Sequence, residues 1–409
     1  MPGNTDLVER SGDLKVELVS FALRPRFAKT LRQEVERRFG ERAEMDESEF
    51  ANFLDWFILQ GRLPGGRGVV EHFVADHPEL PEEERAMLLG WRDVVEGIFE
   101  VKRREGEALV VDNLVDELTY RVRSNMGPAA LRPMRPRSFL IARLVPAGDE
   151  WLLSGIPSVL PAANRDDAYR LAVEYVAQRP ELVARNPEKL AQAWEMQRQE
   201  RRHFIAFFGS DQVVLPGREL AERMQAYAHY RLYDVRDDEG KSAAEYAEEK
   251  YGVVPPPIDF QITAELSDAE TVGVIFDETE GLNLFADFGI VDETFADPPL
   301  TADREHRQAV LEYLKEKSIS PLPFRRLAER DPELASQVFQ RVLGKPGFSW
   351  ERDGETLLRR YKAAYFKQPV LPGLTVLSDP LARAQMSATE TGPSRPDRGS
   401  WRRRWNRKP

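Results

Sequence analysis

Acidic side chains gather in one short stretch of the sequence, between residues 277 and 292. Asp277, Glu278 and Glu280 stand within four positions of one another. Hard cations such as Mg²⁺ need several converging oxygen ligands, and this stretch holds the densest local supply of them. Carboxylates of this kind also act as acid and base in hydrolysis. The spacing matches no calcium-binding loop, however, so a metal-dependent hydrolase is the alternative to a binding function.

The chain offers no other catalytic pattern. It contains no cysteine, which excludes disulfides, thiolate catalysis and any cysteine-ligated zinc or iron–sulfur centre. Its five histidines include no i, i+4 pair of the kind that zinc proteases carry, and Ser210 lacks the second glycine of a nucleophile elbow. We therefore expect a binding protein without a cofactor rather than an enzyme.

The strongest binding signal lies in the C-terminal segment, residues 387–409. Residues 395–409 hold seven basic groups and one acid, which is a charge of +6 in a chain whose net charge is −11. We expect this segment to be disordered when free and to bind RNA or the ribosome, because arginines neutralise phosphates and tryptophans stack on bases. The alternatives are docking on the protein's own acidic body, docking on an anionic membrane surface, or a terminus that is not adapted for binding. The residues expected to bind are Arg398, Trp401, Arg402, Arg403, Arg404, Trp405, Arg407 and Lys408.

A second group of arginines lies in the middle of the chain. Such side chains beside an aromatic such as Phe139 suit phosphates and bases. Residues 97–161 hold nine Lys and Arg against eight Asp and Glu, however, so their charge does not by itself mark a nucleic-acid surface. The arginines that carry this hypothesis are Arg121, Arg123, Arg132, Arg135 and Arg137.

Four aromatic residues near the C-terminal end suggest a third kind of binding. Phe324, Trp350, Tyr361 and Phe366 lie in or after two extended connectors, and together they would form an aromatic groove for a protein partner. Aromatic side chains are more often part of a core, and that alternative stays open. A protein-binding scaffold is therefore a further alternative.

The central arginines are carried by a β module. Five short runs alternate apolar and polar residues and are separated by turn residues, over 98–102, 109–111, 118–123, 138–144 and 151–155. A meander of five short strands closes most readily into a small barrel of the SH3-like or OB-like kind. A helix over 85–96 is expected to lead directly into it.

The segments around this module read as mainly helical, so the fold class is α+β. Pro255–Pro257 marks the best internal boundary. A strand is expected over 260–265, and a hairpin over 272–285 with its turn at Glu280 and Gly281. The expected organisation is a helical N-terminal region (1–96), a small β-barrel (97–162), a helical region with short strands (163–254), a C-terminal α+β domain (255–386) and a disordered basic tail (387–409).

The sequence also bears on location. No run approaches eighteen apolar residues, and the first residues lack a basic and then apolar leader. We expect a cytoplasmic protein without a membrane span.

Two stretches of the sequence resemble a family. Residues 53–57 with 62–66, and residues 208–217, are similar to a group of poorly characterised bacterial proteins that carry a SEC-C motif, the small cysteine-rich zinc element also found at the C-terminus of the SecA translocation ATPase. The resemblance spans roughly residues 45–380, but the zinc motif needs cysteines and this chain has none. It implies no catalytic residues, and it places the basic tail where the zinc element would lie. The leading hypothesis is a non-enzymatic binding or adaptor protein with RNA or the ribosome as its partner.

Overall fold

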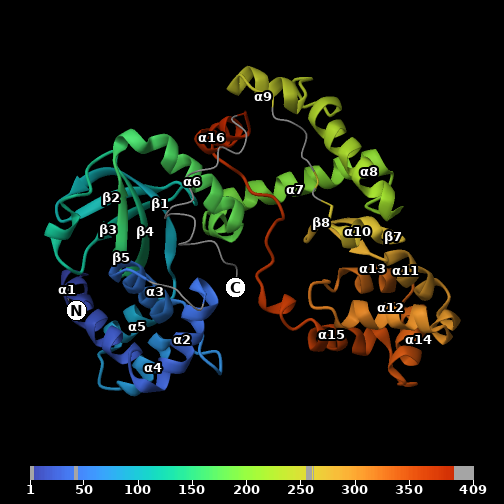
Figure 1. The fold of residues 1–409 in the computed structure, drawn as a ribbon, viewed down its shortest axis with the longest axis horizontal. Helices are drawn as coiled ribbons and strands as arrows, with labels where there is room; N and C mark the ends of the chain where they lie inside the picture. Colours follow the sequence, from blue (N-terminus) through green and yellow to red (C-terminus); the bar gives the residue numbers. More distant parts are fainter. Residues whose placement is uncertain (1–3, 41–44, 255–259, 261, 391–409) are drawn as a thin grey trace. The chain divides into compact units, whose positions relative to one another are not determined.

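The chain folds into two compact units (Figure 1). The computed structural model describes residues 4–40, 45–254, 260 and 262–390. The first unit comprises residues 1–189 with 377–409, and the second comprises 190–376. The proline run at 255–257 therefore falls within the range of the second unit, and it lies outside the described residues.

In the described part of the first unit, the chain forms five strands and seven α-helices. An N-terminal helix over Asn4–Ala22, which the sequence analysis does not include, opens the unit. The helices are α1 (Asn4–Ala22), α2 (Pro25–Phe39), α3 (Glu47–Leu59), α4 (Val69–Asp76), α5 (Glu82–Gly90), α6 (Arg165–Gln178) and α16 (Asp379–Glu390). The strands are β1 (Val95–Glu105), β2 (Ala108–Asn113), β3 (Thr119–Arg123), β4 (Phe139–Ala147) and β5 (Glu150–Leu160).

The five predicted strands are present, but they do not follow one another as a meander. Their order is β1-β2-β3-β5-β4, and β1 pairs with β4, so the sheet closes on itself. All pairs are antiparallel except β3 with β5, where Val122 lies opposite Trp151 in a parallel pair. The expected meander is therefore wrong. Strand β4 does not pair with β3, the strand before it in the chain, but with β1 and β5.

The helix expected over 85–96 is also shorter than predicted. The helix α5 ends at Gly90, and Val95 and Glu96 already belong to β1. Val95 faces the interior of the closed sheet together with Phe99 and Val101. An apolar residue that alternates into this interior stabilises strand structure, which overrides the local helical pattern.

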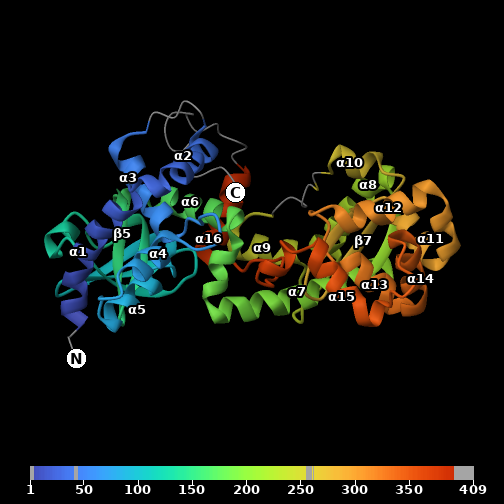
Figure 2. The same ribbon diagram turned by 90° about the horizontal axis from the view of Figure 1, so that it is seen from below.

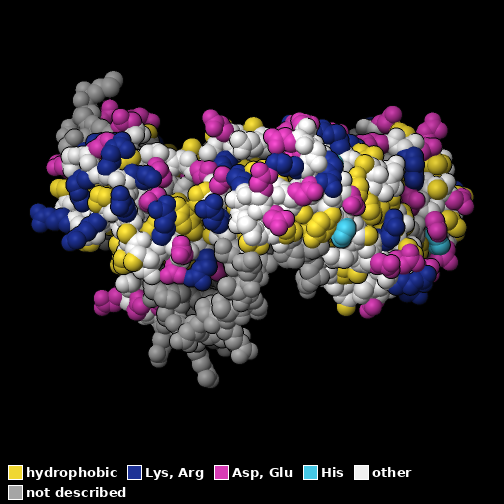
Figure 3. All heavy atoms as spheres, turned by 90° about the horizontal axis from the view of Figure 1, so that it is seen from above, with side chains coloured by type: hydrophobic (Ala, Val, Ile, Leu, Met, Phe, Trp, Pro, Cys, Tyr) yellow, Lys and Arg dark blue, Asp and Glu magenta, His cyan; other side chains and the backbone are white. Residues whose placement is uncertain are grey.

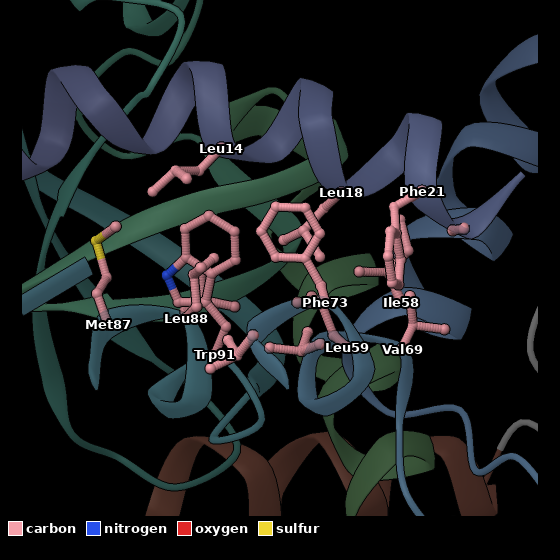
Figure 4. Close-up of a cluster of buried hydrophobic side chains, with 14 of the residues drawn as sticks. Leu14, Leu18, Phe21, Ile58, Leu59, Val69, Phe73, Met87, Leu88 and Trp91 are labelled. Carbon is pink, nitrogen blue, oxygen red and sulfur yellow. The ribbon is translucent and has the colours of Figure 1, made fainter. Parts of the chain in front are cut away.

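A helical layer covers one end of the closed sheet. Its core joins α1, α3, α4 and α5 to the sheet residues Val145, Ala147 and Leu152. Figure 4 shows side chains of α1, among them Leu14, Leu18 and Phe21, pointing toward the shorter helices. Phe21 meets the ring of Phe73 edge-on at 5.2 Å.

The helices α6 and α16 cover another part of the same sheet. Ala168, Ala172 and Val176 of α6 pack with Ile98 of β1 and with Leu381 of α16. The helix α16 continues through residues 387–390, the first part of the segment expected to be disordered. The tail residues Arg398 to Lys408 lie outside the described residues.

The second unit contains one small sheet and several helices. The strands are β6 (Gln212–Pro216), β7 (Thr271–Asp277) and β8 (Gly281–Ala286), in the order β6-β7-β8 with antiparallel pairing. The helices are α7 (Pro187–Phe208), which begins in the first unit, α8 (Gly217–His229), α9 (Ala243–Tyr251), α10 (Ala264–Asp268), α11 (Phe288–Ala296), α12 (Arg304–Lys315), α13 (Leu322–Arg330), α14 (Pro332–Leu343) and α15 (Trp350–Tyr361).

Helices pack on both faces of this sheet. Val272, Val274 and Phe276 alternate toward a core with α7 and α8, while Ile275 faces the core of α11 to α15. The predicted hairpin β7–β8 with Gly281 at its turn is confirmed. The strand expected over 260–265 is wrong, because Thr263 caps the short helix α10, which contains Glu265. Within the described parts of the chain, no helix combines the length and the apolar character that a bilayer crossing requires.

Candidate ligand pocket in the first unit

A cavity of about 470 Å³ lies in the first unit, at the outer side of β4 and β5. Figure 2 shows α2 and α3 on the same side of this unit, near β5. The volume falls in the range of small-molecule sites. Its lining residues come from α2, α3, α6 and the sheet: Arg38, Phe39, Glu49, Asn52, Phe53, Trp56, Ile98, Ile141, Ala142, Arg143, Ser154, Ile156, Ser158, Leu160, Asn164, Asp167, Arg170, Leu171, Glu174, Tyr175 and Gln178.

The walls of the cavity are mainly apolar. Helix α3 contributes Phe53 and Trp56, which lie three positions apart on one side of the helix. The sheet contributes isoleucines, one of which, Ile156, keeps 49% of its surface exposed. Large apolar side chains left open beside a concave surface are typical of a binding site.

An asparagine of α3 holds a bulge in β5 beside the cavity. Ile141 pairs with Ser158 and Arg143 with Ser154, so three residues of β5 lie opposite one residue of β4. The amide of Asn52 replaces the missing strand partner: its Nδ2 donates to the carbonyl of Ile156 at 3.0 Å, and the Ile156 amide donates to its Oδ1 at 2.8 Å. β-Bulges commonly redirect side chains near functional sites.

A buried ion network forms the base of the cavity. The carboxylate of Asp55 accepts hydrogen bonds from Lys15 Nζ at 2.5 Å, from Ser154 Oγ at 2.8 Å and from Arg143 Nη1 at 3.0 Å. Burial alone would raise the pKa of Asp55, but the charges of Lys15 and Arg143 outweigh it and hold the pKa below its usual value. This arrangement keeps Asp55 charged and engaged, so it is a positioning group and not a free acid.

Glu96 of β1 extends the network toward α6. Its carboxylate lies 3.7 Å from Arg143 Nε, and it pairs with Arg179. The hydroxyl of Tyr175 donates to the same carboxylate at 3.4 Å. Burial, followed by the charge of Glu96, raises the pKa of Tyr175. The three elements that enclose the cavity are thus joined beneath it by charged side chains.

One cation at the cavity is not part of this network. The guanidinium of Arg38 lies over the ring of Trp56, with Cζ 3.3 Å from the ring centre. Its Nε is buried and has no hydrogen-bond partner among the described residues. Burial first, and then repulsion by Arg37, lower the pKa of Arg38 to about 10. The charges of Glu34 and Glu96 act in the opposite direction, but neither forms an ion pair with Arg38 among the described residues.

The carboxylates predicted to bind a metal have other partners. Asp277 Oδ2 pairs with Arg326 at 2.8 Å, and its Oδ1 accepts from the Thr279 amide at 2.9 Å. Glu280 accepts from the hydroxyl of Tyr365 at 2.7 Å, and Glu278 is largely exposed. Among the described residues, no three His, Asp or Glu side chains converge as metal ligands would. In this arrangement these carboxylates are directed to other partners, and the metal site stays a prediction.

The predicted aromatic groove is not formed, because its four residues pack in or against a hydrophobic core. Phe324 is fully buried in the core of α11 to α15. Trp350 stacks on Phe339 at 5.3 Å, and Tyr361 and Phe366 pack against the same core. The alternative left open by the sequence, that these side chains stabilise the core, is the one the packing supports.

The central arginines divide into two groups. Arg121 pairs with Glu105 and Glu150, and Arg123 pairs with Glu107 and Glu150, so their charges are largely compensated. The other three lie in the segment between β3 and β4 and are exposed, and within the described part of the chain no carboxylate lies within ion-pair distance of them. They are Arg132, Arg135 and Arg137. Figure 3 shows a face of the first unit, at the left of the view, on which Lys and Arg side chains gather.

The cavity was not predicted from the sequence. Its main polar residues stand far apart in the chain, as Asp55 and Arg143 do. One local signal was available: Asp55 interrupts the apolar run Phe53–Phe57 on a helix, which indicates a buried carboxylate with a partner. The partner itself carries no such signal in a chain with 46 arginines.

Comparisons with known proteins add no assignment. No family model matches the chain, and neither the curated proteins nor the solved structures contain a significant match. The resemblance to the SEC-C group therefore stays a prediction.

Proposed function

We propose that the protein is a non-enzymatic binding protein whose first unit holds a small molecule with an apolar body in the cavity between α3, α6 and β5. The observation that carries this proposal is the cavity itself: about 470 Å³, with aromatic and aliphatic side chains in its walls and charged and polar side chains between them. The ionisable groups at its base, Asp55 and Arg143, are saturated by each other and by their neighbours. They support a rigid binding site rather than acid–base chemistry.

A neutral apolar probe tests this proposal. The fluorescence of N-phenyl-1-naphthylamine should rise saturably with the full-length protein, at one site per chain. The variant Leu171→Trp places a larger side chain in the cavity wall and should abolish the signal. Ala177→Trp adds the same side chain on the exposed side of the same helix and is the matched control. Absence of saturable binding, or equal binding by the two variants, would refute the proposal.

A second candidate function is RNA or ribosome binding through the β module and the basic tail. It is favoured by the three arginines of the segment between β3 and β4, which are exposed and lack acidic partners among the described residues. The strand order β1-β2-β3-β5-β4 also favours the OB-like over the SH3-like type, and OB-like barrels bind single-stranded nucleic acid.

Salt dependence of RNA binding tests this second function. Replacing Arg132, Arg135 and Arg137 by Gln should lower the slope of log K against log salt by about 2 for a single-stranded RNA, roughly 0.7 for each phosphate contact. Replacing Arg121 and Arg123 by Gln is the control, because these arginines are already paired with glutamates. Deleting residues 387–409 tests the tail in the same assay. An unchanged slope in the triple variant and in the deletion would exclude this function.

The hydrolase alternative requires a rearrangement. Asp277 would have to leave Arg326, and Glu280 would have to leave Tyr365, before they could share a metal ion. A thermal shift with Mg²⁺ or Mn²⁺ tests it, since a ligand of the folded form raises its stability.

A further inference from the structure

Some charged side chains around the cavity have ion-pair partners and others do not. Arg38 has none among the described residues. Its guanidinium is half-buried between the cavity and the ring of Trp56, and no carboxylate of the described residues lies within ion-pair distance of it. The buried Nε has no hydrogen-bond partner there. A desolvated cation without a partner is unfavourable, so a ligand that supplies an anion at this point gains binding energy.

The other cations that line the cavity have partners already. Arg143 is paired with Asp55 and lies near Glu96. Arg170 is exposed and pairs with Asp167. Neither therefore competes with Arg38 for an incoming anion.

The acidic side chains that line the cavity already have hydrogen-bond or ion-pair partners, or they are exposed to water. The side chain of Glu49 accepts a hydrogen bond from the Asp46 amide in the cap of α3. Asp167 accepts from Asn164 in addition to pairing with Arg170. Glu174 lies at the exposed rim, where water solvates its charge. The half-buried group whose charge is least satisfied is thus positive.

We infer that the cavity recognises an amphipathic organic carboxylate, with its carboxylate on Arg38 and its apolar body against the aromatic and aliphatic walls. This inference rests on the proposed function and deepens it by naming the class of ligand. The geometry that carries it is the position of a guanidinium without an ion-pair partner among the described residues, at one side of a cavity with aromatic and aliphatic walls.

A carboxylate fits better than a more highly charged group. Two N–H groups of a guanidinium form a fork that matches the two oxygens of a carboxylate. The stacking on Trp56 holds the plane of this fork in place, so little freedom remains to be lost on binding. A phosphate dianion would need a second free cation, and Arg143 and Arg170 are engaged.

Calorimetric titration of the full-length protein with matched probes tests the inference. The aromatic pair is 1-naphthoate and 1-naphthalenemethanol, and the aliphatic pair is decanoate and decanol; each pair differs mainly in the charge of its head group. Wild-type protein should bind the carboxylate of at least one pair more tightly than the alcohol, roughly tenfold to a hundredfold, as expected for a charge-assisted pair. The better pair identifies the shape of the apolar body.

Two substitutions on α2 isolate the role of Arg38. Arg38→Met keeps an apolar stem over Trp56 and should remove the preference for the carboxylate over the alcohol. Arg37→Met removes a neighbouring, exposed arginine that pairs with Glu34, and it should keep the preference. Circular dichroism and the melting temperature of each variant verify that the fold is retained.

The outcomes separate this inference from the proposed function. Equal affinity for carboxylate and alcohol in the wild type, or a preference that survives Arg38→Met, overturns the inference and leaves the apolar site standing. Failure of all four probes to bind the wild type overturns both. A preference that is lost with Arg38 and kept with Arg37→Met supports both.

Discussion

The guanidinium of Arg143 and the carboxylate of Asp55 form an ion pair in which both partners are buried, with 5% and 4% of their side-chain surface exposed and 3.0 Å between Nη1 and Oδ2. Arg143 also donates to the carbonyl of Asn52 at 3.0 Å. Because Arg143 belongs to β4 and the other two residues belong to α3, the pair joins the closed sheet to the helical layer. It thereby sets the distance between two walls of the cavity.

Removing the acid from this pair should destabilise the first unit strongly. Asp55→Ala leaves the buried Arg143 and the partly buried Lys15 without their anion, and loss of one partner of a buried pair costs about 3–5 kcal/mol in the free energy of unfolding. Urea unfolding followed by circular dichroism measures the loss, and hydrogen exchange of peptides from α3 and β4 locates it. Asp13→Ala, at a side chain that is 77% exposed, is the control and should cost less than about 1 kcal/mol. Equal losses in the two variants would contradict the role given to Asp55.

The same carboxylate predicts a pH dependence. The pKa of Asp55 in the folded protein lies below the ordinary value of 3.8, so the unfolded chain takes up this proton first as the pH falls. The stability that Asp55 contributes is present above pH 3.8 and is lost as the pH falls through the pKa of the folded state. The difference in unfolding free energy between wild type and Asp55→Asn should therefore be constant near neutral pH and shrink below pH 3.8. A difference that stays constant down to the acid limit of the fold would argue against an ionised Asp55.

Gly155 should resist substitution more than other glycines with positive φ. Its φ is +72°, and a Cβ would lie 2.5 Å from Asn52 Oδ1, the atom that holds the β5 bulge. Gly106, with φ +60°, has open space around it. Gly106→Ala should cost about 1 kcal/mol for the left-handed backbone alone, and Gly155→Ala should cost at least about 1 kcal/mol more because Asn52 must move. Urea unfolding of the two variants makes the comparison.

The clash predicts a further result for the double variant. Asn52→Ala removes the atom that a Cβ at Gly155 would meet, so the two changes together should cost less than the sum of the single changes, by about 0.5–3 kcal/mol. Additive costs would show that Asn52 does not constrain this bulge.

Because of Lys362 in the second unit, the free energy of unfolding should rise with pH. Its side chain is 2% exposed, and its Nζ donates to the carbonyl of Tyr313 at 2.6 Å and to that of Glu316. Burial lowers the pKa of Lys362 from 10.5 to about 8, so between these values unfolding takes up a proton. Stability should therefore increase from pH 8 to pH 10.5, by up to about 3 kcal/mol from this group.

A matched pair of variants isolates this contribution. Lys362→Met should flatten the rise in stability over that window, whereas Lys367→Met, at an exposed lysine nearby in the chain, should keep it. Urea unfolding at intervals between pH 7.5 and pH 10.5 provides the measurement. If both variants follow the wild-type profile, burial does not shift the pKa of Lys362.

Local patterns in the sequence predicted many of the helices and strands of this protein. The alternation of apolar and polar residues in runs such as 118–123 predicts a strand, because successive side chains of a strand point to opposite faces. The turn at Gly281 likewise predicts the hairpin β7–β8. The boundary between α5 and β1 was not predictable in this way, because Val95 and Glu96 suit either structure until a sheet interior is available to receive them.

The sequence by itself determined the α+β class, the five strands of the central module and the absence of any cysteine chemistry, since each depends on residue types or on neighbours a few positions apart. Only the tertiary structure decided that β4 pairs with β1 and β5, that Phe324 is buried, and that Asp277 pairs with Arg326. It also decided the cavity, because Arg38, Trp56 and the walls that face them come from segments up to 140 positions apart. Such contacts follow from the packing of whole elements, and no periodicity within one segment encodes them.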